Sequence, residues 1–380
     1  MLNTILALLA LLSLLLLVWQ WLAGLQFPLH QRLDESAAAA GVTLLKSLKG
    51  CDSATADCLR SWMVQDYSGP IQVLFGVASA EDPACQVVRG LLAQCPALDA
   101  QLIVCGPLTG TNSKVAKLVQ LERLARHDLL VISDADVKVP PDFLRNALPP
   151  LQQPEVGLVN CFYRLANAST LAMQWEAIAV NADFWSQVLQ AQNLKPLDFA
   201  LGAVMATRRQ QLKDIGGLAA LADCLADDYQ LGNRIAHGGH RIVLSPVVVE
   251  CWSRPMSWAD VWKHQLRWAR TVRVCQPLPY FFSILSNATL WPLVWLALKP
   301  SAYSLVFFVF SLLLRIISAR QLQWRLLSYQ SSTRSAPFWL APVKDLLQTG
   351  IWMGAFLGNR IEWAGRKMIL RRDGTLQPVT

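Results

Sequence analysis

Two aspartates, Asp134 and Asp136, have the residue type and spacing that could seat a divalent cation. They follow the apolar run 129–132 within HDLLVISDADVKV, residues 127–139. In an extended chain, side chains two residues apart project in the same direction. Carboxylate oxygens and substrate phosphates are the ligands that Mg²⁺ and Mn²⁺ prefer in proteins. Aspartate is also common in turns. The pair alone therefore leaves two interpretations open, a metal site and a solvated turn.

Further acidic residues come at intervals along the chain. Asp52 follows a Gly turn, and Asp227 with Asp228 opens a predicted helix that ends near Gly238. Each has an ordinary structural interpretation, since aspartates form turns and stabilise the first turn of a helix. A later pair, Arg267-Trp268, fits a snorkelling cation beside a membrane-interface aromatic equally well. Only their occurrence together raises the functional interpretation above the structural one.

The elements that must position these residues alternate between strand and helix. Ligands of open α/β sheets gather at the carboxyl ends of the strands, where Asp52, Asp134 and Asp136 would lie. Alternation with short gaps is typical of βαβ units and a parallel sheet. For the run 128–132 periodicity alone also allows a short helix. The predicted strands lie within 41–52 and at 71–78, 102–104, 128–132, 156–162 and 241–250, and the predicted helices at 82–94, 113–125, 170–192 and 257–274, with another beginning near Leu59.

Composition points to a membrane. Hydrophobic residues make up 53% of the 380 residues, charged residues only 16%, and there are 15 tryptophans. A net charge of +8 suits an anionic membrane surface or a phosphorylated ligand. Nucleic acid, the other usual partner of a basic protein, is not an expected partner here. The nine cysteines form no Cys-x-x-Cys pair, which excludes a zinc or disulfide framework and fits small core residues in a reducing compartment.

The first 28 residues are predicted to form a transmembrane anchor. Residues 2–25 carry no charge, and Trp19 and Trp21 lie near one end, as in an aromatic belt. A cleaved signal peptide is the other interpretation, but it would have a basic start and a small-residue cleavage site. Basic residues after the anchor, such as Arg32 and Lys46, place the following domain, 29–256, in the cytoplasm by the positive-inside tendency.

Residues beyond 256 are predicted to return to the membrane. The helical pattern in 257–280 combines Trp and basic residues, which favours an amphipathic interfacial helix over an ordinary surface helix. Residues 281–318 read as a transmembrane hairpin interrupted at Lys299-Pro300. Within 319–380, the apolar segment 337–357 contains Lys344 and Asp345, a costly pair in lipid. That segment is therefore re-entrant, interfacial, transmembrane or packed on other helices, and a basic cytoplasmic tail follows it.

The ordered set of motifs resembles the ceramide glucosyltransferase-like family of membrane glycosyltransferases, which includes bacterial hopanoid-associated enzymes. The resemblance covers nearly the whole chain. It implies an α/β fold of the GT-A (Rossmann-like) type, with a mixed or parallel sheet and transmembrane helices at both ends. The residues that carry it are KSLKGCD at 46–52, SDAD at 133–136, DDYQLG at 227–232 and HQLRW at 264–268.

The resemblance also implies a role for each matching residue. Asp52 and Asp134 would bind the nucleotide sugar, and Asp134 with Asp136 would hold Mg²⁺ or Mn²⁺. Asp228 would be the general base, with Asp227 beside it. The remaining members of the implied site lie on the later helix: Arg267 and Trp268 by the diphosphate or the acceptor, and His264 where the family usually has Gln or Arg.

These roles predict a UDP-sugar:lipid hexosyltransferase in a membrane. A carboxylate would take the proton of a lipid hydroxyl during attack, and one base opposite the leaving group predicts inversion. The expected donor is a UDP-sugar carrying glucose or N-acetylglucosamine, and the expected acceptor is ceramide or a hopanoid polyol. Two other classes stay open: a processive polysaccharide synthase, which shares the motifs, and a non-enzymatic membrane binding module.

Overall fold

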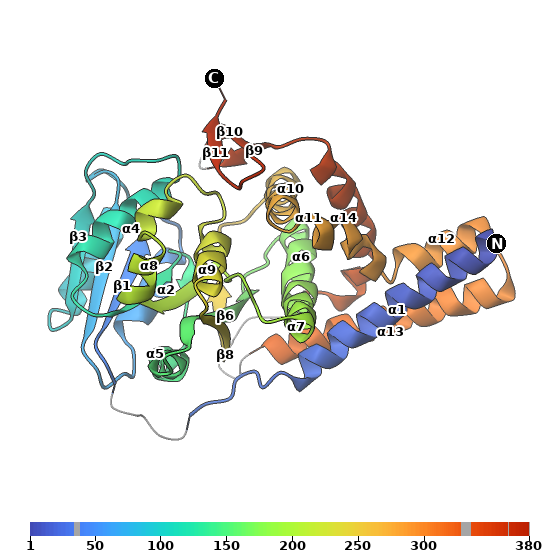
Figure 1. Cartoon of the computed structure of the whole chain (residues 1–380), viewed down its shortest axis with the longest axis horizontal. Helices are drawn as coiled ribbons and strands as arrows, with labels where there is room; N and C mark the ends of the chain where they lie inside the picture. Colours follow the sequence, from blue (N-terminus) through green and yellow to red (C-terminus); the bar gives the residue numbers. More distant parts are fainter. Residues whose placement is uncertain (34–38, 328–335, 364, 380) are drawn as a thin grey trace. The chain divides into compact units, whose positions relative to one another are not determined.

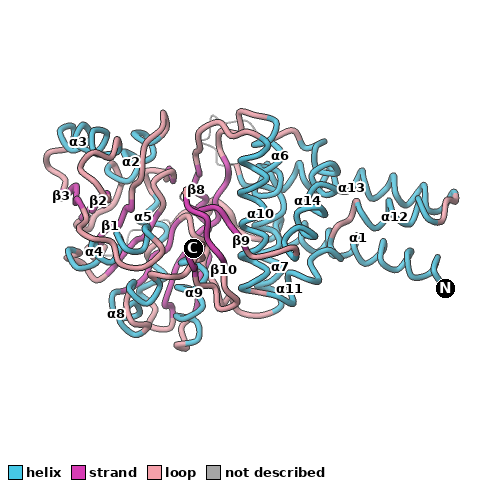
Figure 2. Tube along the Cα trace, turned by 90° about the horizontal axis from the view of Figure 1, so that it is seen from above, coloured by secondary structure: helices cyan, strands magenta, loops and turns pink. Residues whose placement is uncertain are grey.

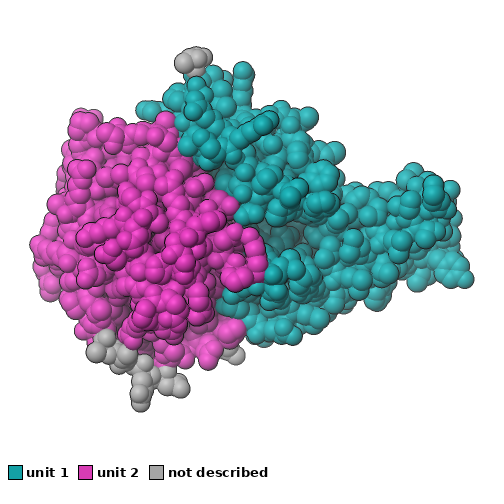
Figure 3. All heavy atoms as spheres, viewed as in Figure 1, with its two compact units in different colours: residues 1–27, 167–194, 255–380 teal, residues 28–166, 195–254 magenta. Residues whose placement is uncertain are grey.

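The computed structural model describes residues 1–33, 39–327, 336–363 and 365–379. The chain forms two compact units, which Figure 3 shows in two colours. Unit 2 comprises residues 28–166 and 195–254. Unit 1 comprises residues 1–27, 167–194 and 255–380. Each unit is built from segments that are distant in the sequence.

Unit 2 is organised around an eight-stranded mixed sheet of order β3-β2-β1-β4-β7-β6-β8-β5. The first four strands in this order run parallel, because helices on the sheet faces return the chain to the same edge (Figure 1). β7 is antiparallel to both β4 and β6, and β5 is antiparallel to β8. The strands are β1 (Val42–Ser47), β2 (Ile71–Val77), β3 (Asp99–Val104), β4 (Leu129–Ser133), β5 (Val137–Lys138), β6 (Val156–Leu165), β7 (Val204–Arg208) and β8 (Arg241–Cys251).

Helices cover this sheet and complete its core. Apolar residues of the central strands, such as Leu44 and Val131, are fully buried together with Trp62 and Phe143, whose rings meet edge to face. Continuous apolar runs suit strands that are buried on both faces. The helices of unit 2 are α2 (Thr55–Met63), α3 (Ala84–Gln94), α4 (Ser113–Leu124), α5 (Phe143–Ala147), α8 (Arg209–Asp214) and α9 (Asp227–His237), with two short 3₁₀ turns, η1 (Pro149–Gln152) and η3 (Leu218–Leu221).

Most predicted elements of unit 2 are confirmed within a few residues. α2 is the exception among the helices, because it begins at Thr55 rather than near Leu59. The reason is local: Oδ1 of Asp52 accepts hydrogen bonds from the backbone N–H groups of Ala54 and Thr55 and from the Thr55 hydroxyl. This acceptor satisfies N–H groups that a helix start leaves without partners, so the helix starts one turn earlier.

Unit 1 is helical apart from a small sheet near residue 370. The predicted helix 170–192 is present as three consecutive pieces, in which a π-helical stretch joins two α-helices. Ser257 and Asp260 form a complete capping box at the start of α10. The helices are α1 (Leu2–Gln26), α6 (Leu171–Ile178), η2 (Ala179–Phe184), α7 (Trp185–Leu194), α10 (Trp258–Cys275), α11 (Pro277–Phe282), η4 (Ser283–Ser286), α12 (Leu290–Leu298), α13 (Ala302–Leu326), η5 (Phe338–Leu340) and α14 (Ala341–Phe356).

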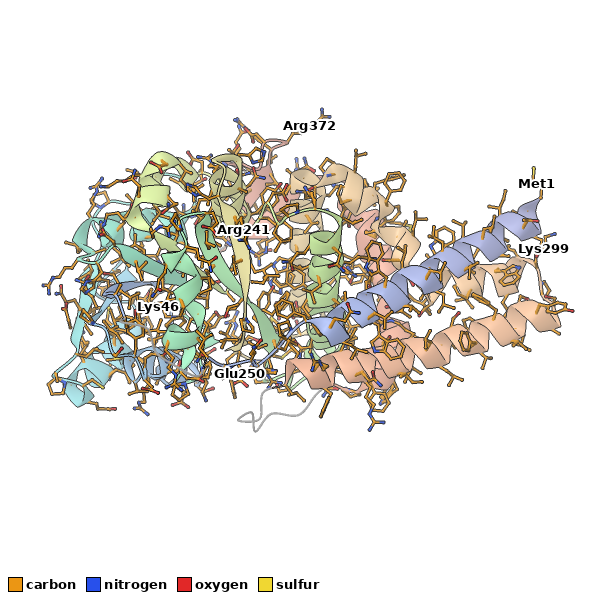
Figure 4. All side chains as sticks on the ribbon, turned by 60° about the horizontal axis from the view of Figure 1, so that its bottom comes forward. Met1, Lys46, Arg241, Glu250, Lys299 and Arg372 are labelled. Atoms are coloured by element: carbon orange, nitrogen blue, oxygen red, sulfur yellow. The ribbon has the colours of Figure 1, made fainter. Side chains whose placement is uncertain are left out.

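Two helices of unit 1, α1 and α13, are long and apolar enough to cross a membrane, counting only the described residues. The segments Pro277–Ser286 and Leu290–Leu298 together form a further candidate, bent by 57°. α1, α12 and α13 run side by side (Figures 1 and 2). Met1 and Lys299 lie at the same end of this bundle (Figure 4).

The region predicted as a basic tail contains regular structure. β9 (Arg360–Trp363), β10 (Arg366–Leu370) and β11 (Leu376–Pro378) form an antiparallel sheet of order β11-β10-β9. Its inner residues Ile361, Met368, Leu370 and Leu376 are buried. No strand was predicted here, because the alternation of apolar and polar residues is short and many of these residues are charged.

A glycine on α9 sets how closely this helix approaches its neighbour. A Cβ on Gly232 would clash with the backbone N of Ala200 and lie 2.5 Å from the carbonyl carbon of Phe199. Gly90 on α3 is the matched control, because a Cβ there meets nothing within 4 Å. We expect Gly232→Ala to lose about 1–3 kcal/mol of unfolding free energy by overpacking, and Gly90→Ala to gain up to about 1 kcal/mol from helix propensity.

Thermal unfolding of the full chain in detergent, followed by Trp fluorescence, compares the two variants. If Gly232→Ala has the same melting temperature as the wild type, α9 does not pack closely against residues 199–200.

Candidate active site

The site lies where the direction of strand succession reverses in unit 2. From β1 the chain adds β2 and β3 on one side, and β4 lies on the other. Such switch points open a crevice at the carboxyl ends of the strands. Asp52 follows β1, and Asp134 follows β4 directly. Oδ1 of Asp52 caps α2 as described, and Oδ2 takes part in none of those bonds.

The Asp134–Val137 segment is a turn rather than an extended chain. The Val137 N–H donates to the Asp134 carbonyl at 3.4 Å. The extended chain that would make the two carboxylates project in one direction is therefore absent here. Three residues from other elements hold the turn. The buried Lys46 donates from Nζ to the Asp134 carbonyl (2.7 Å), the half-buried Trp252 donates its backbone N–H to the Asp136 carbonyl (2.9 Å), and the buried Trp62 donates its indole N–H to the Val137 carbonyl (2.9 Å).

Lys46 is the buried support of this turn. It lies on β1 beside Ser133 of β4, and its Nζ donates to the Ser133 hydroxyl at 3.0 Å. The same nitrogen lies 4.2 Å from the ring centroid of Trp62. Figure 4 shows Lys46 among the strands of the sheet. Burial lowers the pKa of Lys46 to about 7, against the opposing pull of Asp134.

Asp136 is open to water at the edge of the sheet. Desolvation by the surrounding protein and then the negative charge of Asp134 raise the pKa of Asp136 to about 7. Repulsion between neighbouring carboxylates is what a shared cation relieves. Among the described residues no three His, Cys, Asp or Glu side chains converge on one point. Two carboxylates fit a Mg²⁺ or Mn²⁺ ion that takes its other ligands from a substrate diphosphate and water, which is the usual arrangement for Mg²⁺.

Lys114 joins the two acidic clusters of unit 2. From the first turn of α4, its Nζ lies 2.7 Å from Asp134 Oδ1 and 3.1 Å from Asp227 Oδ2. Burial alone would lower the pKa of Lys114, but the two carboxylates outweigh burial and hold the pKa above its ordinary value. The carboxylates that follow β4 and those that open α9 are therefore parts of one site.

The start of α4 is held against the loop that leads to α9. Asn112 caps α4, and its side-chain amide donates to the Cys224 carbonyl at 2.8 Å. The Thr111 N–H donates to Asp223 Oδ1 at 2.8 Å, and the Asn112 N–H donates to the Ala222 carbonyl at the same distance. This clamp fixes where Lys114 stands relative to Asp227.

Asp228 is half-buried in the first turn of α9. Burial, and then the charge of Asp227, raise its pKa to about 6, although Lys114 and the Tyr229 N–H oppose the shift. A Cβ on Gly202 would lie 2.5 Å from Asp228 Oδ2. Gly202 thus leaves room for this carboxylate. A carboxyl with a pKa near 6 is suited to take a proton close to neutral pH.

Unit 1 carries the other predicted site residues on α10. The rings of His264 and Trp268 are in contact, with centroids 4.5 Å apart and planes inclined by 56°, and Arg267 lies between them in the sequence. Nδ1 of His264 lies 2.6 Å from Oε1 of Glu176, which is 1% exposed and also accepts from the Gln265 amide at 2.8 Å. A buried carboxylate therefore fixes the orientation of the His264 ring.

Three residues that support the site were not predicted from the sequence: Lys46, Lys114 and Glu176. Lys46 stood inside a quoted motif without a role, and Lys114 is one of several basic residues on its helix. Glu176 lies in a predicted helix with no motif around it. Each of them has a partner that is 87 to 113 positions away in the sequence. The pairs are Lys46–Ser133, Lys114–Asp227 and Glu176–His264. No local signal marks such contacts.

The fold is that of GT-A glycosyltransferases. A mannosyltransferase from Pyrobaculum calidifontis, solved in complex with GDP-Man and Mn²⁺, is similar with a TM-score of 0.55 and 20% sequence identity. The likeness covers 92% of this chain and 99% of the mannosyltransferase. At this identity the likeness concerns the fold.

The chain belongs to glycosyl transferase family 21, whose model matches residues 2–376. Among curated relatives, ceramide glucosyltransferase 3 of Caenorhabditis elegans is 23% identical over 221 residues, or 58% of this chain and 48% of that protein. Ceramide glucosyltransferase of Candida albicans is 29% identical over 126 residues, or 30% of this chain and 23% of that protein. The chain thus spans about half the length of the first of these relatives.

The bridging role of Lys114 makes a pH-dependent prediction. Lys114→Met leaves Asp134 and Asp227 without their shared cation, so the acidic cluster repels itself. The penalty is largest when Asp136 and Asp228 are also ionised, above their pKa values of about 7 and about 6. It shrinks as pH falls through that window. We expect the melting temperature of Lys114→Met to fall further below that of the wild type at pH 8 than at pH 5.

Exposed Lys213 on α8 supplies the control, since no ion pair within 4 Å is found for it among the described residues. Lys213→Met should track the wild type at both pH values. A melting-temperature difference for Lys114→Met that does not change with pH would contradict the bridge.

Proposed function

We propose that this chain transfers a hexose, glucose or N-acetylglucosamine, from a UDP-sugar to the hydroxyl of a membrane lipid, with inversion at the sugar. The observation that carries the proposal is the Lys114 bridge, which unites Asp134 and Asp227 in one site. Membership of family 21 and the candidate membrane helices α1 and α13 support a lipid acceptor.

On the donor side, Asp52 and the Asp134–Val137 turn flank the crevice between β1 and β4. Asp52 has Oδ2 for the nucleoside, and Asp134 and Asp136 would hold a divalent ion with the diphosphate. Such an ion would neutralise the negative charge that develops on the leaving diphosphate. Arg267 is proposed to bind the same diphosphate, since a guanidinium matches phosphate geometry. Trp268 is proposed to pack beside it.

On the acceptor side, Asp228 takes the proton from the lipid hydroxyl as its oxygen attacks the anomeric carbon. The bond from that carbon to the diphosphate breaks at the opposite face, so a UDP-α-sugar gives a β-glycoside. Asp227, fixed by Lys114, holds Asp228 in place and tunes its pKa. His264, oriented by Glu176, is proposed to contact the acceptor or the diphosphate through Nε2.

The catalytic unit is proposed to face the cytoplasm. Arg320 and Arg325 lie in the last two turns of α13, whereas Met1 and Lys299 lie at the opposite end of the bundle. The positive-inside tendency assigns the arginine end to the cytoplasm. α1 ends toward the same side and leads the chain into unit 2.

The base assignment predicts both a loss of rate and a pH profile. Asp228→Asn should lower kcat by about 10²–10⁴-fold while donor binding persists, because Asn cannot accept the proton. In the wild type, kcat/KM should fall as pH drops through about 6, since the protonated carboxyl is inactive. Asp227→Asn should move this acidic limb to lower pH, because it removes a charge that raises the pKa of Asp228.

Asp214→Asn on exposed α8 is the control and should reproduce the wild-type profile. Full turnover by Asp228→Asn would remove Asp228 as the base.

The proposed reaction itself is tested with the full chain in liposomes, a panel of UDP-sugars and total lipid extract. We expect one UDP-sugar to yield a lipid heavier by a single sugar, with a β linkage by NMR, and EDTA to stop the reaction until Mn²⁺ is restored. A ladder of products would instead indicate a processive synthase. No UDP release with any lipid would favour a binding module.

A further inference from the structure

One face of α14 carries exposed apolar residues that continue just beyond both ends of the helix. Val343, Leu346 and Met353 of α14, Trp339 of η5 before it and Leu357 directly after it recur at spacings of three, four and seven residues, so they lie in one stripe, the α14 stripe. Their exposed fractions are 58%, 48%, 40%, 53% and 85%. Soluble surfaces rarely present so continuous an apolar strip, and such strips mark a membrane or a partner.

The opposite face of α14 packs inside unit 1 against α6, α10 and α13. Ala341, Ile351 and Ala355 are buried there together with the charged pair Lys344 and Asp345. The charged residues of α14, which would disfavour a location in lipid, therefore lie on its inner face. Side chains of other helices can pair with them there.

The pair is neutralised within the helical unit. Arg315 of α13 donates to Asp345 at 2.8 and 2.9 Å and to Asp183 at 2.9 Å. Lys344 forms ion pairs with Asp183 and with Asp345, the latter at 2.9 Å. Thr289 donates to Asp345 at 2.6 Å. The two cations thus neutralise the two carboxylates. These ion pairs offset the free-energy cost of placing Lys344 and Asp345 near lipid.

Neighbouring elements extend the stripe. The indole of Trp262 on α10, 39% exposed, lies 3.5 Å from the position a Cβ on Gly350 would take. On the other flank, Phe281 of α11 contacts Trp352 and Phe356 and is itself half exposed. The apolar surface therefore runs from α10 across α14 to α11.

Basic side chains gather at the C-terminal end of α14. The Arg273 guanidinium lies 5.7 Å from the Phe356 ring centroid, and Arg270 donates to the Arg360 carbonyl. The sheet that follows exposes Arg360, Arg366, Lys367, Arg371 and Arg372. Cations beyond the end of an apolar stripe match the anionic headgroups above the acyl region of a bilayer.

We propose that the α14 stripe, together with Trp262 and Phe281, lies against the acyl chains of the bilayer as a membrane contact additional to α1 and α13. The proposal rests on the membrane location given under the proposed function. Its occupant is lipid, because the stripe is continuous with helices that could cross a membrane and ends in basic residues. Unit 1 then contacts the lipid phase along α10, α11 and α14 as well as through its spanning helices.

The test uses the full wild-type chain in vesicles of phosphatidylcholine and phosphatidylglycerol that contain a phospholipid with an acyl-chain diazirine. Irradiation and mass spectrometry map the adducts. We expect adducts on Leu346 and Met353, as well as on exposed α1 and α13 residues such as Leu15 and Leu313. Leu124 of unit 2 is the matched control, equally exposed at 47%, and should stay unlabelled.

Adducts on α1 and α13 without any on the stripe would overturn this inference and leave the membrane location intact. Absence of adducts from all three helices would overturn both. A stripe that is protected while the protein runs as a cross-linkable dimer would show that a second copy covers it, which also overturns lipid contact.

A variant pair gives an independent readout. Met353→Asp should lower the melting temperature in vesicles, because it places a charge against acyl chains. Leu124→Asp should leave it unchanged. Equal behaviour of the two variants in vesicles would contradict the proposal.

Discussion

The site depends on holding like charges together. Asp134 and Asp136 follow β4, Asp227 and Asp228 open α9, and Lys114 links the two pairs, so four negative charges lie in one region of unit 2 and repel one another. Lys114 bridges the two clusters through ion pairs of 2.7 and 3.1 Å. Lys46 fixes the backbone of the turn that carries Asp134 and Asp136. In a partly desolvated setting, one lysine between carboxylates is worth more than a surface ion pair, because screening is weaker.

The same crowding of carboxylates contributes to the raised pKa of two of them. Asp136 and Asp228 have raised pKa values because burial disfavours their charged forms and because each lies beside another carboxylate. A carboxyl whose pKa is raised toward neutrality is suited to proton transfer. Asp228, close to Gly202 and away from the β4 turn, is the carboxyl left for proton transfer under the proposed mechanism.

Sequence patterns predict the repeating parts of the fold well and the supports of the site poorly. Strand β2 and helix α4 follow from apolar runs and helical spacing, which are local properties of the chain. The Asp134–Val137 turn was missed because its geometry depends on Trp62, Trp252 and Lys46 from other elements. Lys114 and Glu176 were missed for the same reason, since their roles exist only through distant partners. The strands of the 360–378 sheet were too short and too charged to stand out.

One cysteine has a consequence for studying this enzyme. Of the nine thiols, Cys51 is the one that is exposed, and it directly precedes Asp52, whereas burial raises the pKa of Cys58, Cys161 and Cys251 and keeps them protonated. Thiolate is the reactive form. Maleimide dyes should therefore attach first beside Asp52, where the nucleotide is proposed to bind, which gives an environment-sensitive fluorescent reporter of ligand occupancy without engineering a new residue.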